Sequence, residues 1–223
     1  MTPMPDTKPR QTAPKSAFPF RWIPSRSLSE RHRPRILAHL LGLPPHDRYL
    51  RFGYAASDGQ VSAYVDRMDF DRDEVFGIFD RRLQLIGMAH LALLEPGAAE
   101  FGVSVSPWAR GRGYGERLFD HAVLHARNRG VDTLVIYALS ENSAMLKIAR
   151  KAGARVVRSG GDAEARLALP PEDFASRVEE LVESQAAELN YRVKVQARRA
   201  EAVIDAIGDV KQRMGARRRV ASE

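Results

Sequence analysis

The 223-residue chain contains no cysteine, which excludes disulfides, thiolate metal sites and cysteine nucleophiles. The same absence fits a reducing compartment, so we expect a cytoplasmic location. The sequence also has no apolar run near the roughly 18 residues of a membrane-spanning helix. Residues 1–15 are rich in Pro and Thr and lack an apolar h-region, so we expect no secretory signal there.

Acidic residues are scarce at the two ends of the chain. Residues 1–35 carry eight Lys or Arg against two acids, and residues 190–223 carry nine against four. Residues 36–189 carry 18 against 22, so the net charge of +7 arises from the ends. Basic tails can bind nucleic acid or anionic membrane. More often they are solvated, and no nucleic-acid-binding motif accompanies these. We therefore expect neither nucleic acid nor a membrane as a partner.

A strand-to-helix turn after residue 106 is the most informative stretch. Residues 101–106 alternate between apolar and polar, which predicts a strand, and Pro107 ends it. Glycines then stand at every second position before a helical pattern begins. Such glycines let backbone N–H groups turn toward one point, where they and the helix dipole attract an anion, most simply a phosphate. Two arginines add side-chain charge. The predicted phosphate-binding loop consists of Arg110, Gly111, Arg112, Gly113, Tyr114 and Gly115.

The spacing of this loop excludes two common alternatives. A dinucleotide-binding fold needs G-x-G-x-x-G, and a P-loop needs a Lys after its last glycine. What matches is Arg110-x-x-Gly113-x-Gly115, the R/Q-x-x-G-x-G/A signature of the GNAT superfamily of N-acetyltransferases, which this chain resembles. The resemblance implies that the loop amides hold the pyrophosphate of acetyl-CoA. We therefore expect acetyl-CoA as cosubstrate, and no metal.

The order of elements along residues 18–169 supports the same fold. The pattern predicts a strand at 18–23, a helix from Ser27 or Ser29 through Leu43, an extended piece at 48–52, a helix beginning at 57–58, strands at 75–79, 83–94 and 99–106, a helix ending at Gly130, a strand buried on both faces at 133–139, a helix capped at 140–143, and a hairpin of 156–157 and 165–169. This is the order of the GNAT fold. We expect an α/β (α+β) protein with a mixed, mostly antiparallel sheet of six to seven strands flanked by helices.

Four segments divide the chain. Residues 1–17 are predicted to be a disordered basic segment, 18–169 the acetyltransferase domain, 170–214 an amphipathic helical extension and 215–223 a basic tail. A long helix needs a partner for its apolar stripe. We expect the extension to pack on the catalytic domain first, and then on a second copy in a homodimer.

The GNAT resemblance also implies roles on the strand 99–106. Backbone groups of Val103 and Val105 should hold the pantetheine arm, and an N–H near Val103 should stabilise the oxyanion. Glu100 is the predicted general base, since a partly buried carboxylate there can take the proton of the amine directly or through water. The alternative is a structural glutamate at a strand end, paired with an arginine.

Part of the sequence resembles the catalytic domain of bacterial protein-lysine acetyltransferases that act on acyl-CoA synthetases. The matching pieces are Tyr49-Leu-Arg-Phe52, Asp69-Phe-Asp71-Arg72, Ala99-Glu100-Phe101 and Asn142-x-x-x-Met145. In those enzymes the glutamate in this context is catalytic. Their large acyl-CoA-synthetase-like portion is absent here, so substrate identity does not carry over.

One position departs from the family pattern. Many GNAT enzymes have a Tyr that protonates the leaving thiolate where this chain has Ala149. Three alternatives follow: the thiolate leaves unaided, it takes the proton of a water, or Tyr137 or Ser143 substitutes for the missing Tyr. We therefore expect an N-acetyltransferase acting on a primary amine, either a protein lysine or a small amine. The alternative is a non-catalytic acyl-CoA-binding regulatory module that acts through its helical extension.

Three further groups have two interpretations each. Asn142 can touch pantetheine or serve only as a helix cap. The acidic cluster Asp69, Asp71, Asp73 and Glu74 can attract a cationic acceptor, although such a run is usually a solvated edge. His121 and His125 have metal-binding spacing on a helix but no third ligand in the sequence, so a structural role is favoured.

Overall fold

The computed structural model describes residues 25–95, 97–170 and 191. Its strands are β1 (Arg26–Ser27), β2 (Glu74–Phe79), β3 (Leu85–Glu95), β4 (Ala98–Val105), β5 (Thr133–Leu139), β6 (Arg155–Ser159) and β7 (Asp162–Ala168). Its helices are α1 (Arg33–Leu41), α2 (Pro45–Phe52), α3 (Asp58–Asp66), α4 (Tyr114–Asn128) and α5 (Ser143–Lys151), with short 3-10 turns η1 (Glu30–His32) and η2 (Pro107–Ala109).

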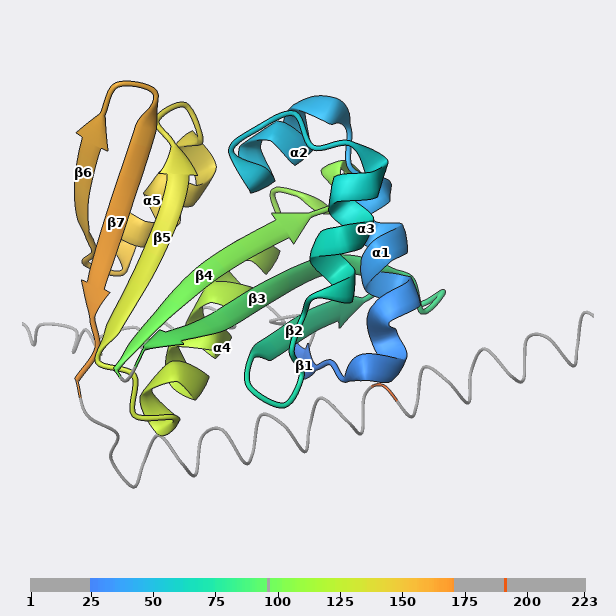
Figure 1. The fold of residues 1–223 in the computed structure, drawn as a ribbon, viewed down its shortest axis with the longest axis horizontal. Coiled ribbons are helices and arrows are strands. Elements are labelled where there is room, and N and C mark those ends of the chain that lie inside the picture. Colours follow the sequence, from blue (N-terminus) through green and yellow to red (C-terminus); the bar gives the residue numbers. More distant parts are fainter. Residues whose placement is uncertain (1–24, 96, 171–190, 192–223) are drawn as a thin grey trace, which may run out of the picture.

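The strands form one seven-stranded sheet in the order β1-β2-β3-β4-β5-β7-β6 (Figure 1). All neighbouring strands are antiparallel except β4 and β5, which run parallel. The predicted fold class is therefore confirmed. The crossover that makes β4 and β5 parallel is α4, which also covers the sheet.

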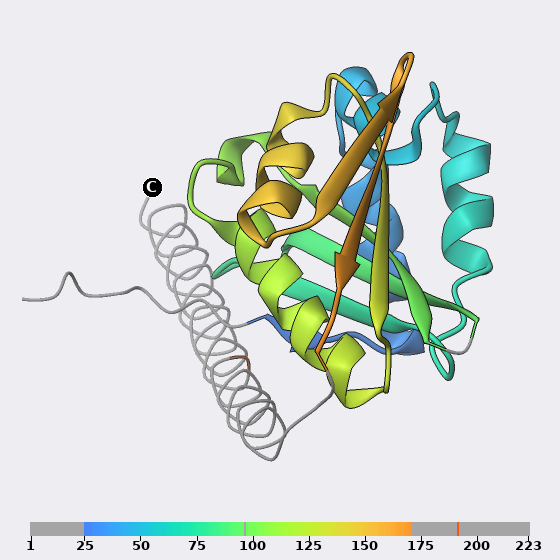
Figure 2. The same ribbon diagram turned by 90° about the vertical axis from the view of Figure 1, so that its left-hand side faces the viewer.

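Helices cover both faces of the sheet (Figure 2). On one face α4 and α5 enclose an apolar core in which the rings of Phe101 and Phe119 meet edge to face, with centroids 5.1 Å apart. On the other face α1 and α3 cover a second core that includes Ile36, Val61 and Met88. Side chains alternate along a strand, so Glu100, Gly102 and Ser104 of β4 all point to the α1–α3 face, opposite to Phe101.

Local signals place most helix ends where the sequence predicts them. Ser57 caps α3 by accepting a hydrogen bond from the N–H of Gln60, whose side chain accepts from the N–H of Ser57 in return. Asn142 caps α5. Gly130, with a φ of 74°, follows the end of α4.

The extended piece predicted at 48–52 is wrong, because this segment belongs to α2. Pro44 and Pro45 follow the end of α1. Pro45 also begins α2, since its fixed φ and missing N–H suit a first helical position. Asp47 lies in the first turn of α2, where its negative charge interacts favourably with the helix dipole. Gly53, with a φ of 80°, ends α2 by donating its N–H to the carbonyl of Tyr49.

The prediction that β5 is buried on both faces holds except at one residue. Leu134 and Ile136 are buried on one face, and Val135 and Leu139 on the other. Tyr137, which lies between the latter two on the same face, is 57% exposed.

The predicted strand at 18–23 and almost all of the predicted extension lie outside the described residues. Tyr191 is described: the Arg26 guanidinium lies 3.9 Å from the centroid of its ring, and its hydroxyl accepts a hydrogen bond of 2.9 Å from Arg35. Its ring also packs on Phe79. Among the described residues, no helix has the length and apolarity to cross a membrane.

Candidate active site

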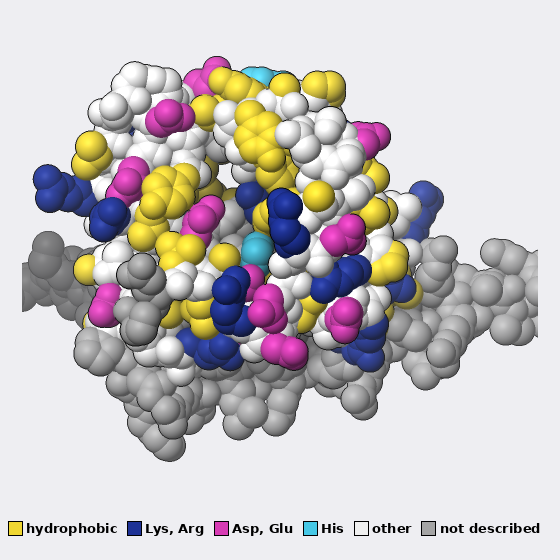
Figure 3. Space-filling view, viewed as in Figure 1, with side chains coloured by type: hydrophobic (Ala, Val, Ile, Leu, Met, Phe, Trp, Pro, Cys, Tyr) yellow, Lys and Arg dark blue, Asp and Glu magenta, His cyan; other side chains and the backbone are white. Residues whose placement is uncertain are grey.

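A cleft opens where β4 and β5 separate. The two strands pair only from Ala98 to Glu100 of β4, opposite Thr133 to Val135 of β5, and then diverge (Figure 1). The resulting cavity has a volume of about 710 Å³ and is lined by β4, β5, α2, α3 and the β6–β7 hairpin. The space-filling view shows this face hollowed between the β5–β7 side and the α2–α3 side (Figure 3).

The phosphate-binding loop lies between β4 and α4. Gly111 and Gly113 have φ angles of 72° and 77°, which L side chains rarely adopt. A Cβ at either position would meet no atom within 4 Å, so the loop surface is open. Helix α4 starts with Gly113 as N-cap and without a side-chain cap, which leaves its first amides available to an anion. These features fit the pyrophosphate of acetyl-CoA.

Of the two loop arginines predicted to attract an anion, Arg110 is already engaged by other groups of the protein. Arg110 forms a 2.7 Å ion pair with Asp47 of α2 and donates from Nε to the carbonyl of Val105 at 3.2 Å. It therefore ties the loop to α2 and β4. The ring of Tyr114 is buried in the core, so only its backbone N–H can face a ligand. Arg112 is exposed, and its charge remains available beside the loop.

Glu100 is the last residue of β4 that pairs with β5. It is half-buried and lines the cleft where the two strands separate. It forms no ion pair with an arginine among the described residues. Val103 also lines the cleft. Val105 does not, and its carbonyl already accepts the hydrogen bond from Arg110. The sequence-predicted acid and the first predicted pantetheine contact therefore share one cavity.

Asn142 does more than cap α5. Its Oδ1 accepts a 3.1 Å hydrogen bond from the N–H of Met145, and its Nδ2 donates to the carbonyl of Leu50 at 3.3 Å. One side chain thus connects α5 to the end of α2 across the cleft wall. Asn142 also lines the cleft, so its two predicted roles are compatible.

The structure narrows the choices for the leaving-group proton. Position 149 is an alanine and is fully buried. It therefore supplies no hydroxyl to the cleft. Tyr137 lines the cleft and is exposed to it. Ser143 is exposed at the start of α5 and does not line the cavity.

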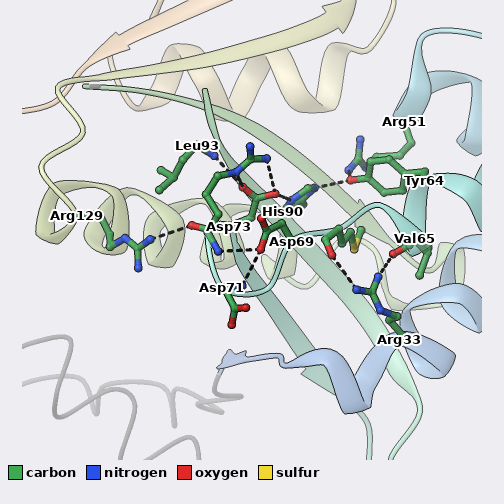
Figure 4. Close-up of polar contacts among 12 residues, drawn as sticks. Arg33, Arg51, Tyr64, Val65, Asp69, Asp71, Asp73, His90, Leu93 and Arg129 are labelled. Carbon is green, nitrogen blue, oxygen red and sulfur yellow. Dashed lines mark hydrogen bonds and ion pairs between the residues drawn. The ribbon is translucent and has the colours of Figure 1, made fainter. Parts of the chain in front are cut away.

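A hydrogen-bonded chain that the sequence analysis missed runs from the cleft into the sheet (Figure 4). The Arg51 guanidinium donates to the Tyr64 hydroxyl at 2.8 Å, and this hydroxyl lies 2.7 Å from Nδ1 of His90. Nε2 of His90 lies 3.0 Å from the Asp73 carboxylate, which also accepts hydrogen bonds from Arg72 and from the N–H of Leu93.

Electrostatics fix the direction of these bonds. Burial lowers the pKa of His90, although Asp73 partly opposes this, so the imidazole is neutral near pH 7. Burial acts to raise the pKa of Asp73, but hydrogen bonds from Arg72 and His90 outweigh it and the pKa is lowered. Since the carboxylate only accepts, His90 donates from Nε2 and accepts from Tyr64 at Nδ1. Burial raises the pKa of Tyr64, which keeps its proton.

The acidic cluster therefore divides in two. Asp73 is buried and bonded to His90, whereas Asp69 accepts hydrogen bonds from the N–H groups of Asp71 and Arg72 in an exposed turn. His121 and His125, the two histidines with metal-binding spacing on α4, are buried, and both rings contact the ring of Phe76. Within the described residues, no group of three potential ligands can hold a metal ion.

Comparison with known proteins identifies the fold. The sequence profile of the family described as "Acetyltransferase (GNAT) domain" matches residues 26–155. The chain belongs to the GNAT acetyltransferase family. The recognition of this family from the loop spacing is thus confirmed, and so is the enzyme class, an acyltransferase that uses acetyl-CoA. No curated protein sequence matches the chain.

Solved GNAT structures share the fold at low sequence identity. The GNAT domain of S. lividans PAT has a TM-score of 0.56 and 20% identity, over 65% of this chain and 89% of that one. A ribosomal-protein-alanine N-acetyltransferase from Brucella melitensis has a TM-score of 0.50 and 20% identity, over 65% and 99%. A phosphinothricin acetyltransferase from Sinorhizobium meliloti, solved with AcCoA, has a TM-score of 0.52 and 15% identity, over 68% and 90%.

Proposed function

We propose that this GNAT enzyme transfers the acetyl group of acetyl-CoA to a primary amine, a protein lysine or a small amine, with Glu100 as general base. The observation that supports this most is the position of Glu100. Its carboxylate lies at the point where β4 and β5 separate, on the cleft face of the sheet and without an arginine partner among the described residues.

Each group has a distinct task in this proposal. The amides of Gly111 and of residues 113–115 hold the pyrophosphate. Backbone groups of Val103 bind the pantetheine arm, together with the N–H of Val105, whose carbonyl accepts from Arg110. Acetyl-CoA supplies an activated thioester. An N–H near Val103 stabilises the negative charge that develops on the carbonyl oxygen. Glu100 accepts a proton from the amine as its nitrogen bonds to the acetyl carbon, and the C–S bond breaks with its electron pair on sulfur.

Tyr137 is our candidate for the proton of the leaving thiolate. Its side chain is exposed and lines the same cleft. Asn142, which bridges α5 and α2, is a second contact for the pantetheine arm.

Replacing Glu100 with Gln tests the mechanism. We expect release of CoA, measured at neutral pH with a broad panel of amines, to fall by about 10²–10⁴-fold, because a positioned general base contributes roughly that much. Acetyl-CoA affinity, measured by calorimetry, should stay near that of the wild type. The control is Glu30→Gln, which removes an exposed acid of η1. Unchanged turnover in the Glu100 variant would remove this residue from the mechanism.

A non-catalytic acyl-CoA-binding module remains the second candidate, favoured by one observation. The position of the usual tyrosine is a fully buried alanine. This candidate predicts acetyl-CoA binding without CoA release for every amine in the panel. Release of CoA above the rate of spontaneous hydrolysis with any amine would reject it.

A further inference from the structure

Arg51 presents its guanidinium in the cleft, flat against the backbone of β4. A Cβ built on Gly102 would lie 2.6 Å from Nη2, 2.7 Å from Nη1 and 2.7 Å from Cζ of Arg51. These nearly equal distances mean that the planar group faces the glycine. Any side chain at 102 would displace it. Arg51 of α2 thus places a cation in the cleft wall, and the absence of a side chain at Gly102 leaves room for it.

The terminal nitrogens of this guanidinium keep donors for a ligand. Nη2 donates one N–H to the Tyr64 hydroxyl, and Nη1 donates to none of the described residues. Nε is buried without a hydrogen-bond partner and cannot reach the cleft. Among these residues Arg51 forms no ion pair, whereas Arg48, Arg72 and Arg110 each pair with an aspartate. A partly buried cation without a counter-ion is costly, so the site favours an anion.

The hydrogen-bonded chain behind Arg51 holds it in place. Tyr64 donates its only proton to His90, so its oxygen is left to accept from Arg51. His90 pairs directly with Gly102 across the β3–β4 ladder and is fixed by the Asp73 carboxylate. The chain therefore orients the guanidinium and consumes only one of its N–H groups. A rigid, preorganised arginine binds a carboxylate well because two parallel hydrogen bonds form without further ordering.

The Arg51 guanidinium and the Glu100 side chain lie on the same face of β4 and line the same cleft. Residues 100 and 102 are two apart, so their side-chain positions are about 7 Å apart along the strand. An amine at Glu100 would thus have a cation within one short carbon chain of it. We infer that Arg51 binds a carboxylate of the acceptor, and that the acceptor is a small amine carrying a carboxylate near its amino group, such as a free amino acid.

This inference rests on the proposed transferase activity for its biological meaning, but it makes a separate statement about binding. The ε-amine of a lysine in a protein is four methylenes from its own backbone and carries no carboxylate. Only a neighbouring acidic side chain could reach Arg51 in that case. Lysine peptides are therefore the competing acceptor in the experiment.

The test is calorimetric binding to the full chain saturated with CoA. The probes are the free amino acids, β-alanine and 4-aminobutyrate, each paired with its carboxamide, which keeps the shape and removes the charge. We expect at least one acid to bind about 10-fold or more tightly than its amide, equivalent to roughly 1.4 kcal/mol. Arg51→Gln should abolish this preference by weakening the acid alone.

Two further variants make the test specific. Gly102→Ala keeps the charge but pushes the guanidinium away; the backbone tolerates alanine here because φ is not positive. It should lose the same preference as Arg51→Gln. Arg67→Gln removes an exposed arginine at the end of α3 and should retain it. Melting temperatures report whether each variant is folded.

The outcomes separate the two proposals. If no acid binds more tightly than its amide, or if Arg51→Gln weakens both equally, the inference is overturned. CoA release from a lysine peptide alongside that result would leave the transferase proposal standing. Acid-selective binding that depends on Arg51, with no CoA release for any amine, would support the carboxylate site and reject the transferase proposal.

Discussion

At the scale of single residues, His39 shows how a buried side chain joins α1 to the sheet. Its Nδ1 lies 3.0 Å from the carbonyl of Leu85 and its Nε2 lies 2.9 Å from the Ser104 hydroxyl. The imidazole therefore donates to β3 and accepts from β4, an arrangement that only the neutral ring allows. Burial lowers the pKa of His39 to about 4.

This pKa makes the fold sensitive to acid. An unfolded histidine binds its proton near pH 6.5, so between pH 6.5 and 4 the unfolded state binds more protons and stability falls as pH falls. From pH 7 to 4.5 the loss from His39 should be about 2–3 kcal/mol in the free energy of unfolding, measured in urea. His39→Gln should lose less over this range, whereas His46→Gln, at an exposed position, should match the wild type. Equal pH slopes in wild type and His39→Gln would contradict this.

Some residues of the site could be predicted from the sequence, and others could not. The place of Glu100 beside the cleft was predictable, because strand alternation and family context mark it locally. Arg51, Tyr64, His90 and Asp73 come from α2, α3, β3 and the turn before β2, and only the tertiary structure brings them together. The one signal for Asp73 was an acidic run, whose members are equivalent in sequence but differ in burial.

At the scale of elements, the β4–α4 connection was predicted well. Strand, proline, glycines and helix follow one another within a short stretch, so local conformational preference decides their structure. Local preference also explains why helix α2 was not predicted: the pair Pro44-Pro45 indicates a helix end more strongly than a helix start. The error mattered, because α2 carries Arg51 and pairs with the loop through Asp47.

Gly113→Ala tests the loop. With a φ of 77° the new side chain strains the backbone by about 1 kcal/mol, and its Cβ occupies the open surface where phosphate should approach. We expect acetyl-CoA affinity, measured by calorimetry, to fall about 10-fold or more. Gly130→Ala imposes the same strain at the other end of α4, with φ 74°, and should lower stability alone. Equal affinities of the two variants would place the pyrophosphate elsewhere.

At the scale of the whole molecule, residue patterns predict the order of elements but do not show where β4 separates from β5. Residue patterns along a strand report burial, but they do not show that pairing stops after Glu100. That separation produces the cleft. It explains why an apolar strand such as β5 carries an exposed Tyr137.

A crystal structure with CoA bound is the most direct measurement of how the fold serves acetyl transfer. We predict the pyrophosphate within hydrogen-bonding distance of the amides of residues 111–115. The pantetheine arm should run along β4 beside Val103, and the sulfur should end near Glu100, with the Arg51 guanidinium still free on the acceptor side. CoA bound outside the cleft, or a sulfur remote from Glu100, would contradict this mechanism.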